Sequence, residues 1–157
     1  MNKVSAHITW ADAIRSDTAK RNGILNYFTK EQLARMTVLA NKVYEPLVAH
    51  FSQSIYISSM FRTPQLNTLI GGAPGSQHMA NHGAAMDLDA EMNVGVTNQQ
   101  VFNYIKDNLE FDQLIAESIK LDGTFDWVHV SFNEGANRKQ VLKMIIQNGQ
   151  KIYEDYS

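Results

Sequence analysis

Apolar residues recur every three or four positions in the first third of the chain, which is the spacing of one face of an amphipathic helix. This stretch predicts a helix that runs to about His50 and buries one face: Leu33, Met36, Ala40, Val43 and Leu47. Thr29 and Gln32 have the spacing of a capping box and mark the helix start. Pro46 lies inside the pattern, so we expect it to kink or locally break the helix.

The rest of the chain alternates between helical and extended patterns. A short helix is expected in residues 7–23, before a turn at Asn22-Gly23. A second capping box, Thr97 with Gln100, predicts a helix that reaches about residue 109, and a last helix is expected over residues 138–146. Runs that are rich in β-formers or alternate apolar with polar residues predict four strands: residues 54–61, 84–90, 111–117 and 127–132.

This order of elements, helices first and then strands and helices intermixed, indicates an α+β fold with a small sheet. The 157 residues correspond to one domain, residues 1–157. We see no linker, repeat or low-complexity segment that would divide them.

Composition excludes several functional classes. Hydrophobic residues make up 44% and charged residues 19%, which is typical of a folded globular chain. The net charge of −2 and the lack of a basic stretch argue against a nucleic-acid partner. With no cysteine, the chain has no disulfide, thiolate ligand or thiol nucleophile. No apolar run approaches the length of a membrane helix, and residues 1–14 lack the pattern of a signal peptide.

The candidate chemistry lies in two short segments. His78 and His82 precede Asp87 and Asp89 in the first segment, and His129 lies in the second. A catalytic zinc site takes three protein ligands from imidazoles and carboxylates and leaves a fourth position open. The alternative is structural: a histidine in a glycine-containing loop is commonly a surface residue, and His129 among apolar neighbours is commonly part of a core.

These segments match a known pattern in order and spacing. The pattern S-x-H-x-x-G-x-A-x-D is matched by Ser76, His78, Gly83, Ala85 and Asp87, and W-[IV]-H-[VIL]-S is matched by residues 127–131. The chain therefore resembles the superfamily of zinc D-Ala-D-Ala carboxypeptidases and L-alanyl-D-glutamate endopeptidases, and especially its small phage-borne, single-domain members. The resemblance implies a Hedgehog/DD-peptidase-like fold, with a small, mainly antiparallel sheet and flanking helices.

One departure from the pattern affects the metal ligands. Four residues separate His78 from Gly83, whereas the family pattern has two. His78 keeps the Ser-x-His context and is the predicted ligand, while His82 is its rival because the inserted residues could carry it into the site. Asp87 occupies the family position, and Asp89, two residues further on, is the weaker candidate.

The resemblance implies a role for each matched residue. His78, Asp87 and His129 would bind zinc, and a carboxylate would act as general base. Asp126, three residues before His129, is the first candidate for this base, although a regular strand would direct it to the opposite face, so a bend is required. Glu117 is the competing candidate.

The remaining predictions concern the substrate and the setting. The resemblance implies that Arg62 and Ser76 bind the substrate. The predicted activity is hydrolysis of peptidoglycan stem peptides, as an L-alanyl-D-glutamate endopeptidase acting as a phage endolysin. The alternatives are a D-Ala-D-Ala carboxypeptidase and a non-catalytic phage structural or wall-binding protein. We expect a monomer that is made in the host cytoplasm, does not insert into the membrane and acts on the cell wall after release.

Overall fold

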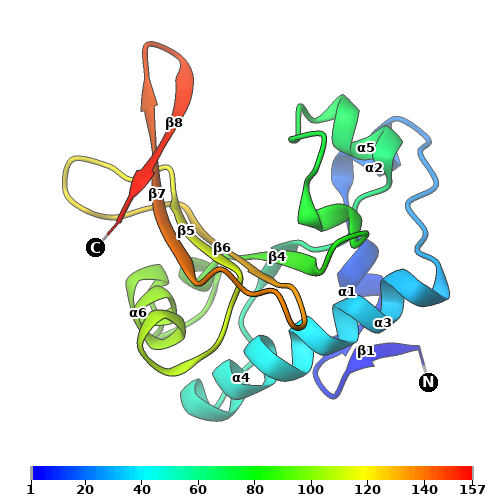
Figure 1. Cartoon of the computed structure of the whole chain (residues 1–157), viewed down its shortest axis with the longest axis horizontal. Coiled ribbons are helices and arrows are strands. Elements are labelled where there is room, and N and C mark those ends of the chain that lie inside the picture. Colours follow the sequence, from blue (N-terminus) through cyan, green and yellow to red (C-terminus); the bar gives the residue numbers. More distant parts are fainter. Residues whose placement is uncertain (1, 157) are drawn as a thin grey trace.

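A six-stranded mixed sheet lies at the centre of the computed structural model, which describes residues 2–156 (Figure 1). Its strand order is β3-β4-β6-β5-β7-β8. The strands are β3 (Ile57–Ser59), β4 (Ala84–Leu88), β5 (Gln113–Glu117), β6 (Trp127–Phe132), β7 (Gln140–Gln147) and β8 (Gln150–Asp155). A separate two-stranded hairpin near the N-terminus joins β1 (Lys3–Ser5) to β2 (Ile8–Thr9).

Helices occupy the N-terminal half and the segment between β4 and β5. They are α1 (Trp10–Ile14), α2 (Asp17–Arg21), α3 (Lys30–Leu39), α4 (Glu45–Phe51), α5 (Pro64–Leu69) and α6 (Asn98–Asn108). Short 3₁₀ turns, η2 (Gln77–Met79) and η3 (Ala90–Met92), flank β4. None of the helices within residues 2–156 is long and apolar enough to span a lipid bilayer.

The hydrophobic core lies between the sheet and helices α3, α4 and α6, which share one side of the sheet (Figure 1). Leu114, Val128 and Val130 point into this core and are fully buried. Side chains alternate between the two faces of a strand, so the residues between them face away from these helices. This opposite face is where the polar residues of β5 and β6 lie.

The long N-terminal helix is interrupted, as the sequence predicts. A π-helical turn, η1 (Ala40–Tyr44), separates α3 from α4, and Pro46 lies in the first turn of α4. Pro46 has no N–H for the carbonyl four residues earlier, and its ring would clash with that carbonyl. The wider turn, in which Glu45 donates its N–H to the Ala40 carbonyl, removes this conflict.

The capping boxes also form. Thr29 and Gln32 exchange side-chain and backbone hydrogen bonds at the start of α3, and Thr97 and Gln100 do the same at α6. The predicted strands are present, although β3 is reduced to three residues. Residues 7–23 hold β2, α1 and α2 rather than one short helix.

The predicted helix over residues 138–146 is wrong, because these residues form most of β7. Apolar residues on both faces of this strand imitate a helical pattern. The chain then turns through Asn148 and Gly149, with φ of 52° and 75°, into β8. Two positive φ values in a two-residue loop are those of a type I′ turn, for which Asn-Gly is the preferred pair.

The α+β class is confirmed, but the description of the sheet as mainly antiparallel holds only in part. The pairing of β5 with β7 is parallel, while the other strand pairs are antiparallel. Strand β6 runs antiparallel to β5, and the chain reverses again to reach the other side of β5. Strand β7 therefore has the direction of β5.

Candidate metal centre

Two histidines and one aspartate meet on the face of the sheet that points away from α3 and α6. One donor atom from each of His78, Asp87 and His129 lies within 4.8 Å of the others. Asp87 on β4 and His129 on β6 are direct partners in the sheet register, so both side chains point to the same face. His78 reaches the pair from η2.

The His78 ring is held in one orientation by its surroundings. Its Nδ1–H donates to the Met60 carbonyl at 2.7 Å, which turns Nε2 toward Asp87 Oδ2 at 3.3 Å. The Arg62 backbone N–H donates to the His78 carbonyl at 3.0 Å and connects η2 to the segment that follows β3. A hydrogen bond from the second ring nitrogen is the usual means of orienting a metal-binding histidine.

The protonation states suit a metal ion. Burial lowers the pKa of His78, which favours the neutral imidazole that binds metals. Burial alone would raise the pKa of Asp87, but His78 and His129 outweigh it and hold that pKa well below its usual range. His129 Nδ1 lies 3.0 Å from Asp87 Oδ1. Two imidazoles around an ionised, buried carboxylate fit the donor set of a zinc site.

The inserted residues between His78 and Gly83 do not bring His82 into this cluster. Ala80 adopts a left-handed conformation, with φ of 54°, and His82 is exposed. The His82 carbonyl accepts a hydrogen bond from Gln77. Asp89 also lies elsewhere, because its carboxylate caps η3 by accepting from the Glu91 N–H.

A cleft of about 700 Å³ lies over the cluster. The loop of residues 71–75 forms one wall, and residues of β7 and β8 form the other. Figure 1 shows these two parts on opposite sides of the sheet's exposed face. Arg62, Ser76 and Glu117 all line the cleft, so these three predicted residues are brought together with the metal cluster.

Glu117 is the carboxylate that faces the cluster. It is paired with Trp127 across β5 and β6, and Trp127 lies two residues before His129, so Glu117 and His129 share one face. Burial raises the pKa of Glu117 to about 7; its interaction with His129 opposes this rise, while the Asp87 carboxylate adds to it. A carboxylate with this pKa can exchange a proton near neutral pH.

Asp126 lies outside the cleft. Its Oδ1 is 2.8 Å from Lys120 Nζ, and both side chains are largely exposed. Its backbone N–H donates to the Glu117 carbonyl just before β6 begins at Trp127. The chain does bend at residue 126, but the Asp126 side chain is directed to Lys120 and does not line the cleft, so the geometry favours Glu117 over Asp126.

The two predicted substrate-binding residues also have structural partners. Arg62 Nη2 lies 3.4 Å from Asp87 Oδ2, and Arg62 Nε donates to Ser59 Oγ at 3.3 Å. Burial lowers the pKa of Arg62. Ser76 Oγ accepts from the His78 N–H at 3.3 Å. Both residues therefore support the metal cluster while they line the cleft.

One supporting cluster gives no recognisable signal in the sequence. Asp112 is buried and accepts hydrogen bonds from Gln77 Nε2 at 2.8 Å and from Arg138 Nε and Nη2 at 2.9 and 3.0 Å. It joins η2, β5 and the segment before β7. An isolated aspartate before a strand has no motif, so only the fold reveals this role.

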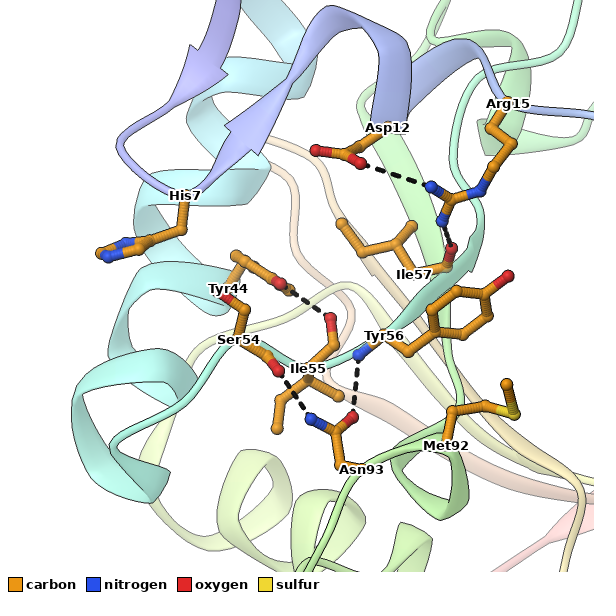
Figure 2. A pocket seen from close by; sticks show the side chains of 10 residues that line it. All are labelled: His7, Asp12, Arg15, Tyr44, Ser54, Ile55, Tyr56, Ile57, Met92 and Asn93. Carbon is orange, nitrogen blue, oxygen red and sulfur yellow. Dashed lines mark hydrogen bonds and ion pairs between the residues drawn. The ribbon is translucent and has the colours of Figure 1, made fainter.

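A second cavity, of about 400 Å³, lies beside β3 and α1 (Figure 2). Its polar groups are largely paired with one another. Asp12 binds Arg15, and the Tyr44 hydroxyl donates to the Ile55 carbonyl. It contains none of the predicted site residues.

The described geometry fits one class of protein, a metal-dependent hydrolase: three potential metal donors lie at the base of an open cleft, with a carboxylate beside them. The comparison with protein families agrees with this class. The model of the family Peptidase M15 matches residues 6–131, and the chain belongs to this family. The protein is therefore a metallopeptidase, and the superfamily resemblance of its motifs is confirmed. No curated protein matches the sequence.

Proposed function

We propose that the protein is a zinc peptidase that hydrolyses peptidoglycan stem peptides, and specifically an L-alanyl-D-glutamate endopeptidase. The observation that carries the proposal is the buried cluster of His78, Asp87 and His129 at the base of a cleft that Glu117 also lines. The substrate class follows from the family, and the choice of bond follows from the resemblance to small phage enzymes. Lysis of a phage host is the proposed setting.

Zinc is the proposed metal because the donors are two imidazoles and one carboxylate. When bound, zinc polarises a peptide carbonyl and lowers the pKa of a water molecule to about 7. His78, Asp87 and His129 would hold the ion. The carbonyl of Met60 keeps His78 oriented, so the donors are arranged before the metal binds.

Glu117 is the proposed general base, in preference to Asp126. It would accept a proton from the attacking water and deliver it to the leaving amine. Its location in the cleft and its raised pKa support this role. The buried walls around it also reduce the local dielectric, which strengthens its interaction with the reacting groups.

Arg62 is the proposed contact for a substrate carbonyl or carboxylate. A guanidinium donates several hydrogen bonds in a fixed plane, and the Arg62 side chain is still partly exposed in the cleft. Ser76 would contact the substrate or hold the loop before His78. Both proposals rest on side chains that line the same cleft.

The test is digestion of purified peptidoglycan by the zinc-loaded protein, with and without a chelator, followed by mass spectrometry. Chelator-sensitive fragments with a free N-terminal D-glutamate are expected. Loss of terminal D-alanine alone would instead indicate a carboxypeptidase. If zinc-loaded protein gives no chelator-sensitive product, the enzymatic proposal is wrong and the fold serves a non-catalytic role.

A further inference from the structure

The β7–β8 hairpin lies beyond the residues that match the family, yet it forms one wall of the cleft. The family match ends at residue 131, whereas Leu142, Lys151 and Tyr153 line the cavity. Figure 1 shows the hairpin, coloured orange to red, extending past the rest of the sheet. This wall can therefore determine properties that are particular to this chain.

The sheet register directs Lys151 and Tyr153 into the cleft. Tyr153 is paired with Met144 and Lys151 with Ile146 across the hairpin, and Lys151 and Tyr153 are two residues apart, so they share one face. Ala116 on β5 is paired with Lys143 on β7. The next position along both strands aligns Glu117 with Met144, and hence in one row with Tyr153.

Lys151, Tyr153 and Glu117, the proposed general base, line the same cleft and interact electrostatically. The positive charge of Lys151 acts to lower the pKa of Glu117, against the larger effect of burial. Burial, and then the negative charges of Glu117 and Asp87, raise the pKa of Tyr153. The phenol thus stays protonated and can donate a hydrogen bond within the cleft.

Lys151 differs from the other cations near the cleft because its ammonium group is free. Arg62 contacts Asp87, and Arg138 is bound to Asp112. Lys143, on the opposite face of the hairpin, lies 3.6 Å from Glu154. Among residues 2–156, neither the Lys151 ammonium nor the Tyr153 hydroxyl has a hydrogen-bond or ion-pair partner in the structure. A free ammonium beside a free hydroxyl is a suitable site for a carboxylate.

We propose that Lys151, assisted by Tyr153, binds a carboxylate of the substrate next to the bond that is cut. This inference rests on the proposed function and specifies the substrate further. In a stem peptide cut between L-alanine and D-glutamate, the free α-carboxylate of the D-glutamate is adjacent to the scissile bond. The enzyme would then prefer stem peptides that carry this acid over those in which it is amidated.

The test compares two synthetic stem peptides that differ only in having D-glutamate or D-isoglutamine at that position. We expect the zinc-loaded wild-type protein to cleave the acid with a kcat/KM roughly tenfold higher, mainly through KM, since a hydrogen bond to a charged group contributes that much. Lys151→Met removes the preference, and Tyr153→Phe reduces it. Lys143→Met is the matched control on the opposite face of the hairpin and retains the preference.

Calorimetric binding of both peptides to chelator-treated protein provides a readout that does not require turnover. Tighter binding of the acid by the wild type, lost in Lys151→Met, supports the carboxylate site even if no cleavage occurs; the failure then belongs to the proposed function alone. If Lys151→Met keeps the wild-type preference in cleavage and in binding, the carboxylate site is disproved.

Discussion

Glu117, the proposed general base, lines the cleft at the end of β5 and lies on the same face as His129. Glu117→Gln keeps the size of the side chain but cannot accept the proton. We expect kcat to fall by about 100-fold or more, while zinc content stays at the wild-type level because Glu117 is not one of the three clustered donors. Peptide hydrolysis assays and metal analysis of the purified variant measure the two effects.

The matched control is Asp126→Asn, which removes the other candidate carboxylate. Asp126 is paired with Lys120 outside the cleft, so the variant should keep a rate within about twofold of the wild type, as expected for an exposed ion pair. A rate for Asp126→Asn as low as that of Glu117→Gln would return the role of base to Asp126.

Position 83 requires a glycine because of its backbone conformation and because of the atoms that surround it. Its φ is 73°, and a Cβ atom there would lie 2.3 Å from the Phe132 carbonyl oxygen. We expect Gly83→Ala to lower the free energy of unfolding by at least about 2 kcal/mol, because left-handed strain and a backbone clash add together. Gly95→Ala is the control, since Gly95 has φ of 77° but nothing within 4 Å. Equal losses in urea unfolding would show that the contact with Phe132 is unimportant.

At the scale of elements, Asp112 links η2 to β5 and to the segment before β7. Burial would raise its pKa, but hydrogen bonds from Arg138 and Gln77 outweigh burial and lower it. A lowered pKa in the folded state means that the ionised carboxylate adds stability above its unfolded pKa, near 4. That stability is lost as the pH falls through the folded-state pKa.

Asp112→Asn should therefore cost about 2 kcal/mol at neutral pH, and the difference from the wild type should shrink below about pH 4. Urea unfolding of both proteins across this pH range, with a chelator present, checks the prediction. Asp87 contributes equally to the pH dependence of both proteins, so its contribution cancels in the comparison. A difference that is constant with pH would show that the Asp112 charge does not contribute.

The β7–β8 hairpin depends on the turn at Asn148 and Gly149. Gly149→Ala places a Cβ at φ of 75°, which costs about 1 kcal/mol. We expect amide exchange in β8 to accelerate about fivefold, while exchange in β6 is unchanged. Asn148→Gly, which relieves the left-handed conformation at φ of 52°, should leave β8 at least as protected. Uniform acceleration throughout the sheet would instead mean that the hairpin opens only with the whole domain.

The structural features that depend on a few neighbouring residues could be predicted from the sequence. The capping boxes at Thr29 and Thr97 depend on residues three apart, and the interruption before Pro46 depends on one missing N–H. Strand β7 has apolar residues on both faces, so its pattern also fits a helix. The pair Asn148-Gly149 is typical of a hairpin turn. A helix over residues 138–146 is not compatible with a hairpin at this place.

In the candidate site too, motifs indicate some of the residues, while only the fold reveals the others. The motifs indicated His78, Asp87 and His129, which the structure brings together. The choice between Glu117 and Asp126 depends on the register of β5 against β6, which spacing along the chain does not specify. Lys151 and Asp112 carry no motif at all, because their roles arise from the pairing of β7 with β5 and β8 and from a buried ion pair.

For the whole molecule, the candidate metal centre joins two separate segments of the chain, residues 78–87 and the region of His129. Its donors come from η2, β4 and β6, so the intact cluster exists only in the folded state, and zinc should stabilise that state. At a free zinc concentration 100 times the Kd, the gain in the free energy of unfolding is about 2.7 kcal/mol, or a rise in Tm of about 5–10 °C for a domain of this size.

His129→Ala should lose this rise, and His82→Ala, which removes an exposed histidine of the inserted loop, should keep it. Thermal unfolding with zinc and with chelator measures both. If His82→Ala lost the rise and His78→Ala kept it, the inserted loop would carry the ligand, and the folded arrangement of η2 would have to change when zinc binds.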